Sequence, residues 1–335
     1  GESVAQVLAL LGVRVKEDSL GRMTRLELIP LEELGRPRID VVMTVSGIFR
    51  DIFGITAALL QEAVDLAAAA DEPLEANHVR RRILAAAARL ETSATEAGLR
   101  VFSNNPGHYG TGVNHVVDAS DWEERDELAR LFIRRKSHAL GRGRSMPAGA
   151  VFAEALRGVQ VTLQSLDSPE IGVADVDHYY EYLGGLNAAV EHVNKSAPAA
   201  YIADTLGETP RVRSLAEEVA LECRTKLLNP KWYKAMLDHG YQGVHEIAVR
   251  LENTFGWSAT SDAVPAWVYD AAARTFAEEV EVRARMQALN PQAYKRLVGR
   301  LLEAEARGYW SPTEAQRGVL ESLYEQIEAL EEGIV

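Results

Sequence analysis

The stretch from Ile39 to Asp51, IDVVMTVSGIFRD, limits the fold more than any other part of the chain. Its first seven residues are nearly all apolar or β-branched, which is typical of a strand buried on both faces of a parallel sheet. The Ser46-Gly47 pair then opens a helix that we expect to continue to Ala70. Strand, turn and helix form the βα unit of α/β folds, whose ligands bind at the carboxyl ends of strands. Arg50 and Asp51 are therefore expected at the edge of a site; pairing with each other or with surface charges is the alternative.

A second stretch, Phe102 to His115 (FSNNPGHYGTGVNH), mixes turn residues and polar side chains more densely than any other. An apolar lead-in precedes it, and a helix is predicted after it, from Asp121 to Lys136. Glycine lets the backbone adopt positive φ and approach a ligand closely, and functional groups often lie on such loops. Because a glycine-rich loop is a weak motif by itself, a long surface connection is the simpler interpretation.

Strand patterns are concentrated before a flexible stretch, GRGRSMPAG, at residues 141–149. We therefore predict an α/β domain over residues 1–145, with a mostly parallel sheet and flanking helices, and a mainly α-helical domain over residues 146–335. In the second domain Ala199–Asp204 is the one extended segment expected. The Asn-Pro pairs at 229–230 and 290–291 are expected to end one helix and start the next. The predicted helices are 150–166, 175–195, 212–228, 230–240, 242–255, 264–276, 278–288, 291–306 and 312–332.

Charge and composition exclude several classes of function. The net charge of −13 argues against a nucleic-acid-binding protein, which needs a basic face; Arg80, Arg81 and Arg82 are expected on the solvated side of a helix. The single cysteine, Cys223, cannot form an internal disulfide, and we expect it buried and inert. No apolar run approaches the roughly 18–20 residues of a membrane span. The chain lacks the phosphate loop G-x-x-x-x-G-K-[ST], so we do not expect it to hydrolyse ATP.

The densest cluster of acidic and aromatic residues is 175–185, DVDHYYEYLGG. In a helix, Asp175, His178 and Tyr182 would share one face, and Asp177 and Glu181 another. Histidine beside carboxylates can exchange protons near neutral pH, and carboxylates are natural ligands for Mg²⁺. The alternative is a helix amino terminus that Asp175 caps, which explains the acids but not the aromatic run.

Two further motifs lie in the helical half. RTKLLNPKW, 224–232, places Arg224, Lys226 and Lys231 near Trp232, a mixture that suits a planar anion; a helix–turn–helix corner with the tryptophan in the core is the alternative. GWSAT, 256–260, is expected to be a turn after a helix that Gly256 ends, capping the next helix.

Several of these motifs together resemble one family. ELGRPRIDVVMTVSGIFRD (33–51), RVFSNNPGHYGTGVN (100–114), RTKLLNPKWY (224–233) and GWSAT resemble the carboxy-terminal region of the large porphyrin-binding subunit shared by magnesium chelatase and aerobic cobaltochelatase. The resemblance covers essentially the whole chain and implies a fragment, since those subunits are several times longer. Residues 135–137 (RKS), 104–107 (NNPG), HYYEYLGGL and NPKW look like the magnesium branch. His108 and His138 depart from the pattern, because relatives often have a small or aromatic residue there.

The resemblance implies ATP-dependent insertion of Mg²⁺ into protoporphyrin IX, a step of chlorophyll and bacteriochlorophyll biosynthesis. ATP would be hydrolysed by an AAA+ partner subunit that acts with an integrin-domain-containing companion, in the cytoplasm or in a plastid stroma. One alternative is the cobalt enzyme, which inserts Co²⁺ into a hydrogenobyrinate derivative for cobalamin. Another is a non-catalytic module that docks the AAA+ partners.

Within this hypothesis each motif has an expected role. His178 and Glu181 would accept protons or guide the ion, and Asp175 and Asp177 would attract it. Glu181 and Asp177 are the expected contacts to the metal. The residues expected at the porphyrin or its propionates are Asn104, Asn105, Tyr109, Arg50, Arg224, Lys231 and Trp232.

Overall fold

The computed structural model describes residues 2–21, 23–141, 144–166, 168 and 170–333. The chain forms two compact units, each built from three segments: residues 1–113, 126–160 and 188–198 in the first, and 114–125, 161–187 and 199–335 in the second. The predicted domain boundary at 145/146 lies within strand β6 (Arg144–Pro147). Most of the stretch 141–149, which was expected to be a loop, belongs to a pair of strands. Residues 142 and 143 of that stretch lie outside the described residues.

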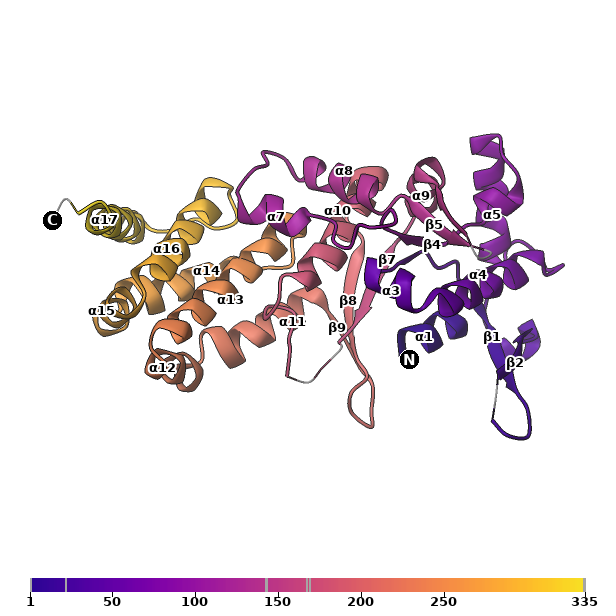
Figure 1. The fold of residues 1–335 in the computed structure, drawn as a ribbon, viewed down its shortest axis with the longest axis horizontal. Coiled ribbons are helices and arrows are strands. Elements are labelled where there is room, and N and C mark those ends of the chain that lie inside the picture. Colours follow the sequence, from indigo (N-terminus) through magenta and orange to yellow (C-terminus); the bar gives the residue numbers. More distant parts are fainter. Residues whose placement is uncertain (1, 22, 142–143, 167, 169, 334–335) are drawn as a thin grey trace. The chain divides into compact units, whose positions relative to one another are not determined.

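The first unit combines short strands with helices (Figure 1). Its described helices and strands are α1 (Glu2–Leu11), β1 (Val13–Glu17), β2 (Met23–Leu28), α2 (Leu31–Leu34), β3 (Met43–Thr44), α3 (Gly47–Ile52), α4 (Gly54–Ala69), α5 (His78–Leu90), α6 (Ala94–Ala97), β4 (Val101–Ser103), most of α8 (Arg125–Arg135), β5 (His138–Gly141), β6, α9 (Gly149–Leu156) and most of α10 (Gly185–Asn194). The larger sheet has the order β3-β4-β5-β6, and β1 and β2 form a separate antiparallel pair.

The α/β class predicted for this half is confirmed, but the four-stranded sheet is mixed: β3 and β4 are parallel, and β4-β5 and β5-β6 are antiparallel. The strand expected over 39–45 is reduced to Met43–Thr44. Ile39 and Asp40 do not join this strand, because the Ile39 N–H donates to the Leu10 carbonyl and the Asp40 carboxylate pairs with Arg100. The helix expected over 46–70 is interrupted at Phe53, where the backbone leaves helical geometry.

Helix α4 lies at the centre of the first unit's core. Ala63, Val64 and Ala67 are fully buried, within a cluster that also takes side chains from α1, α5 and the strands. A buried ion pair lies beside this core. Arg38 is 1% exposed, and it donates to the Glu72 carboxylate and to the carbonyls of Gly12 and Ile29.

Replacing Glu72 by glutamine is expected to lower the free energy of unfolding at pH 7 by about 2 kcal/mol, because Arg38 loses its charged partner while remaining buried. The hydrogen bond from Arg38 lowers the pKa of Glu72 below its ordinary 4.5. A lowered pKa contributes stability above pH 4.5 that is lost as the pH falls through the folded-state pKa. Urea unfolding at pH 7 and pH 3 should therefore show a smaller difference between the two proteins at pH 3. Asp71→Asn, a matched change at an exposed carboxylate, should have little effect at either pH.

The second unit contains the C-terminal helices and a three-stranded sheet. Its elements are most of α7 (Val113–Asp118), β7 (Val161–Ser165), the π-helical turn η1 (Tyr180–Gly184), the start of α10 (Gly185–Asn194), β8 (Ala199–Asp204), β9 (Arg211–Ser214), α11 (Leu215–Glu222), the π-helical turn η2 (Cys223–Leu227), α12 (Pro230–Asp238), α13 (Tyr241–Thr260), α14 (Ala266–Ala273), the π-helical turn η3 (Arg274–Glu278), α15 (Val280–Leu289), α16 (Pro291–Ala306) and α17 (Glu314–Glu331). The mainly helical character expected after residue 146 is confirmed.

The extended segment predicted over Ala199–Asp204 is confirmed as β8, but its two neighbouring strands were not predicted. Strand β7 pairs with β8 in parallel and β9 pairs with it antiparallel. The helices predicted over 150–166 and 212–228 are therefore wrong at residues 161–165 and 212–214; VTLQS and RVRS alternate with the period of two that marks a strand. The predicted helix–helix junctions are confirmed, since Asn229 and Asn290 cap α12 and α16 with proline in the first turn.

The expected turn at GWSAT is also wrong. Helix α13 continues to Thr260, and Gly256 lies in its interior. Cys223 is buried, as predicted. No helix in the described part of the chain is both long and apolar enough to cross a bilayer.

Candidate functional site

In the first unit, the residues expected at the porphyrin edge are grouped around the loop that follows β4. The buried Arg50 of α3 donates from Nη1 to the carbonyl oxygens of Asn104 (2.9 Å), Asn105 (2.9 Å) and His108 (3.2 Å). Its guanidinium lies 5.6 Å from the centre of the Tyr109 ring. Residues of the two stretches 39–51 and 102–115 are thus brought together. Arg50 holds the loop in place from inside the protein and does not present its charge to solvent.

Asn104 is also an internal residue. It is fully buried; its Nδ2 donates to the Gly110 carbonyl (2.8 Å), and its Oδ1 accepts from Lys136 Nζ (3.0 Å). Lys136, buried as well, also donates to the Val45 carbonyl (2.8 Å) and so ties the loop to the end of the neighbouring strand. Of the loop residues expected at the porphyrin, Asn105 and Tyr109 are exposed, as are the neighbouring Pro106 and His108.

Glycine is required where α3 meets this loop. A Cβ on Gly47 would lie 2.5 Å from the His108 carbonyl oxygen and 2.9 Å from the Tyr109 ring. Because such contacts are too short for any side chain, Gly47 lets the helix and the loop pack together. Ser46 caps the helix by accepting from the Phe49 N–H.

An exposed apolar group begins at this junction. Ile48, Ile52, Phe53 and Ile55 are between 50% and 86% exposed, and we call them the α3 apolar face. Adjacent exposed apolar side chains are typical of a binding surface. The sequence pattern of α3 does not distinguish these exposed side chains from core positions, so this face was not predicted.

Charges around the loop set the protonation of its side chains. The hydrogen bond from Arg50 lowers the pKa of Asp51, and the hydrogen bond to Asp51 raises the pKa of Tyr109. Burial, followed by the nearby charges of Arg50 and His108, lowers the pKa of His138. His138 is thus held neutral at pH 7, and its Nδ1 is buried with no hydrogen-bond partner among the described residues.

In the second unit, the 175–185 cluster begins as a turn and becomes helical at His178; from there the helix predicted over 175–195 is confirmed and runs through η1 into α10. The single-face arrangement of Asp175, His178 and Tyr182 is therefore wrong for Asp175, while His178 and Tyr182 do have neighbouring rings, 6.2 Å apart. His178 Nδ1 lies 3.1 Å from the Glu181 carboxylate and 3.6 Å from that of Asp177. Asn114 Nδ2 donates to the Asp177 carboxylate at 2.6 Å.

The histidine and the glutamate of this cluster differ sharply in exposure. The His178 side chain is 69% exposed, whereas that of Glu181 is 1% exposed. A buried carboxylate bonded to one ring nitrogen fixes the orientation of the imidazole and leaves the other nitrogen to react. Burial raises the pKa of Tyr182 to about 12, so its phenol remains a hydrogen-bond donor at neutral pH.

The GWSAT residues of α13 pack directly against this cluster. A Cβ on Gly256 would lie 2.6 Å from the Tyr180 ring, and a Cβ on Gly184 would lie 2.2 Å from Thr260 Oγ1. The Trp257 indole donates to the Val173 carbonyl at 2.9 Å. Close helix-to-turn packing, and not capping, is thus the role of the motif.

Asp175 belongs to a separate ion network. Its carboxylate pairs with Lys226 (2.5 Å) and with Arg250, and the Arg250 guanidinium stacks on Trp232, 4.7 Å from the ring centre. Asp175 and Trp232 are therefore brought together, through an arginine that no local pattern marked. Arg224 instead stacks on Trp267, and Lys231 lies exposed at the start of α12.

Glu222 anchors the backbone before the cluster. Its buried carboxylate accepts from the N–H groups of Val173 (2.6 Å) and Ala174 (2.9 Å), and burial raises its pKa. Among the described residues, no three His, Cys, Asp or Glu side chains form a group able to hold a metal ion.

Comparison with known proteins gives a consistent result. The family model described as CobN/Magnesium Chelatase matches residues 1–317. The chain is 45% identical to the chloroplastic magnesium-chelatase subunit ChlH of Oryza sativa subsp. indica and 44% identical to the corresponding magnesium-chelatase subunit of Cereibacter sphaeroides. Both alignments cover the whole chain, which spans 24% and 28% of these relatives' lengths. The catalytic subunit of cobaltochelatase from Mycobacterium tuberculosis superimposes with a TM-score of 0.95 at 35% identity, over 98% of this chain and 28% of that one.

Proposed function

Because the chain belongs to the CobN/magnesium chelatase family, we propose that it is part of a magnesium chelatase large subunit, a ligase that forms nitrogen–metal bonds. The observation that supports the choice of metal is the identity to magnesium-chelatase subunits, 38–45%, compared with 35–36% to cobaltochelatase subunits. The proposed reaction inserts Mg²⁺ into protoporphyrin IX for chlorophyll or bacteriochlorophyll synthesis. An AAA+ partner, with its integrin-domain companion, hydrolyses the ATP.

The chemistry requires a group that removes two pyrrole protons as the ion enters the ring. We assign proton acceptance to His178, whose exposed ring is held by the buried Glu181 carboxylate at 3.1 Å. Asp177, oriented by Asn114, adds negative charge on the same side of the imidazole and favours a hydrated cation. Asp175 contributes to this field only weakly, since Lys226 and Arg250 neutralise it.

The macrocycle itself is flat and apolar, with two propionates at one edge. The α3 apolar face and Tyr109 supply exposed apolar surface of the kind that such a ring would cover. Asn105 is the exposed amide beside it, while Asn104 and Arg50 shape the loop. Arg224 and Lys231 remain our candidates for propionate contacts, because both are exposed cations.

The proposal is tested with the full-length protein, its AAA+ and companion subunits, and ATP. We expect Mg²⁺ insertion into protoporphyrin IX, followed by the fluorescence of the metallated ring, to outpace Co²⁺ insertion into a hydrogenobyrinate derivative. The reverse preference would favour the cobalt enzyme. If the chain were instead a non-catalytic docking module, substitutions at His178 and Tyr109 would leave both insertion rates and the porphyrin quenching of tryptophan fluorescence unchanged.

A further inference from the structure

Helix α5 carries a cluster of arginines that the proposed chelatase chemistry does not use. Arg81, Arg82 and Arg89 lie on one side of this helix and line a cavity of about 260 Å³. Arg100, before β4, and Arg157, after α9, complete its cationic lining. The expectation that the arginines at 80–82 face only solvent is thus wrong for Arg82, whose side chain is 28% exposed.

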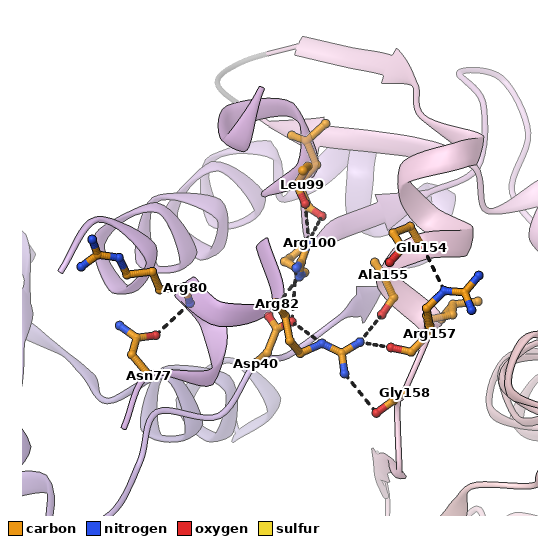
Figure 2. Close-up of polar contacts among 12 residues, drawn as sticks. Asp40, Asn77, Arg80, Arg82, Leu99, Arg100, Glu154, Ala155, Arg157 and Gly158 are labelled. Carbon is orange, nitrogen blue, oxygen red and sulfur yellow. Dashed lines mark hydrogen bonds and ion pairs between the residues drawn. The ribbon is translucent and has the colours of Figure 1, made fainter. Parts of the chain in front are cut away.

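The inner part of the cluster is structural. Arg82 donates to the carbonyls of Ala155, Arg157 and Gly158 and so closes the end of α9 (Figure 2). Its Nε also pairs with Asp40 at 3.1 Å, and Arg100 holds the same carboxylate at 3.0 Å.

The outer part of the cluster is open to solvent. Glu154, 7% exposed, accepts from both Arg89 and Arg157, whose side chains are 52% and 58% exposed. Arg81 is exposed, and no described side chain pairs with it. Donors of Arg81, Arg89 and Arg157 therefore remain available around the cavity mouth.

Positive charge is in excess at this place. Five guanidinium groups line the cavity, and two carboxylates, Asp40 and Glu154, neutralise them among the described residues, which leaves three positive charges uncompensated. The chain as a whole carries −13, so the cluster is opposite in sign to the rest of the molecule. Burial, and then the neighbouring Arg100 and Arg89, lower the pKa of Arg82, effects that a bound anion would oppose.

We propose that this cavity binds a small oxyanion bearing phosphate or carboxylate groups. Guanidinium forks match the oxygen geometry of both groups. The volume lies below the roughly 300–1,000 Å³ of sites for drug-sized ligands, which favours a compact ion over an extended one. The cavity lining includes none of the residues assigned to metal insertion, so anion binding does not depend on the proposed function.

The test is calorimetric titration of the full-length protein with inorganic phosphate, pyrophosphate and citrate in chloride buffer. Saturable binding of at least one of them is expected, and the comparison of phosphates with citrate identifies which group the site prefers. Arg81→Gln should weaken binding about tenfold, since it removes charge-assisted hydrogen bonds. Arg89→Gln should act in the same direction, and raising the salt concentration should weaken binding to the wild-type protein.

Arg130→Gln is the matched control, because Arg130 is an exposed arginine of α8 in the same unit and does not line the cavity. It should bind like the wild type. Because no described side chain pairs with Arg81, the Arg81→Gln protein should fold normally. Circular dichroism checks this expectation. Absence of binding by all three anions, or equal binding by Arg81→Gln and the wild type, would overturn the proposal.

Discussion

Glu181→Gln is expected to lower the rate of Mg²⁺ insertion by about 100-fold or more, the range that general acid–base groups contribute. The substitution keeps the size of the side chain but removes the charge that faces His178 Nδ1 at 3.1 Å. Without that carboxylate, the imidazole loses the partner that fixes its orientation toward a pyrrole proton.

The measurement is the initial rate of Mg-porphyrin fluorescence with the full-length protein, its partner subunits and ATP. His178→Ala should reduce the rate similarly, and the double variant should be little worse than either single one, as for residues that act as a unit. Glu246→Gln, the same change at an exposed glutamate of α13, is the control and should retain the wild-type rate. Wild-type turnover by a folded Glu181→Gln protein would remove Glu181 from the mechanism, and wild-type turnover by a folded His178→Ala protein would remove His178.

Gly256→Ala is expected to lower the free energy of unfolding by about 3 kcal/mol, at the upper end of the cost of overpacking. The added methyl group would lie 2.6 Å from the Tyr180 ring, which is 4% exposed and has no space to retreat. Alanine is favoured over glycine inside a helix by about 1 kcal/mol, but the clash outweighs that gain. Because Tyr180 precedes Glu181 in η1, metal insertion should fall as well.

Gly318→Ala is the matched control for this prediction. Gly318 lies inside α17, and a Cβ there would meet nothing within 4 Å. This variant should gain up to about 1 kcal/mol, because only the helix preference acts. Urea unfolding of both variants therefore separates packing from propensity by the sign of the change. A Gly256→Ala protein as stable as the wild type would show that Tyr180 does not pack as tightly as described.

Much of the local structure could be predicted from the sequence, because short-range chemistry sets it. Proline in the first turn after an asparagine marked the starts of α12 and α16. The short extended segment Ala199–Asp204 identified β8.

Other features depend on contacts between distant segments. VTLQS at 161–165 alternates like a strand but adjoins a helical pattern, and its pairing with the parallel strand β8 decides its structure. By its local pattern, Gly256 resembles a residue that ends a helix. In the structure, the Tyr180 ring occupies the space that a side chain at this position would need. Arg250 joins Asp175 and stacks on Trp232 although 75 and 18 positions separate it from them, distances that no periodicity spans.

The sequence by itself determined the motifs, their order and the family that they resemble, because these depend on residue identity and spacing alone. Tertiary structure decided what each motif does. It turned Arg50 and Asn104 inward to hold the loop, and it gave His178 a buried carboxylate partner and an exposed face. It also gathered arginines from three separate segments around one cavity. Burial and long-range contact set these roles, and both arise only when segments distant in the chain pack together.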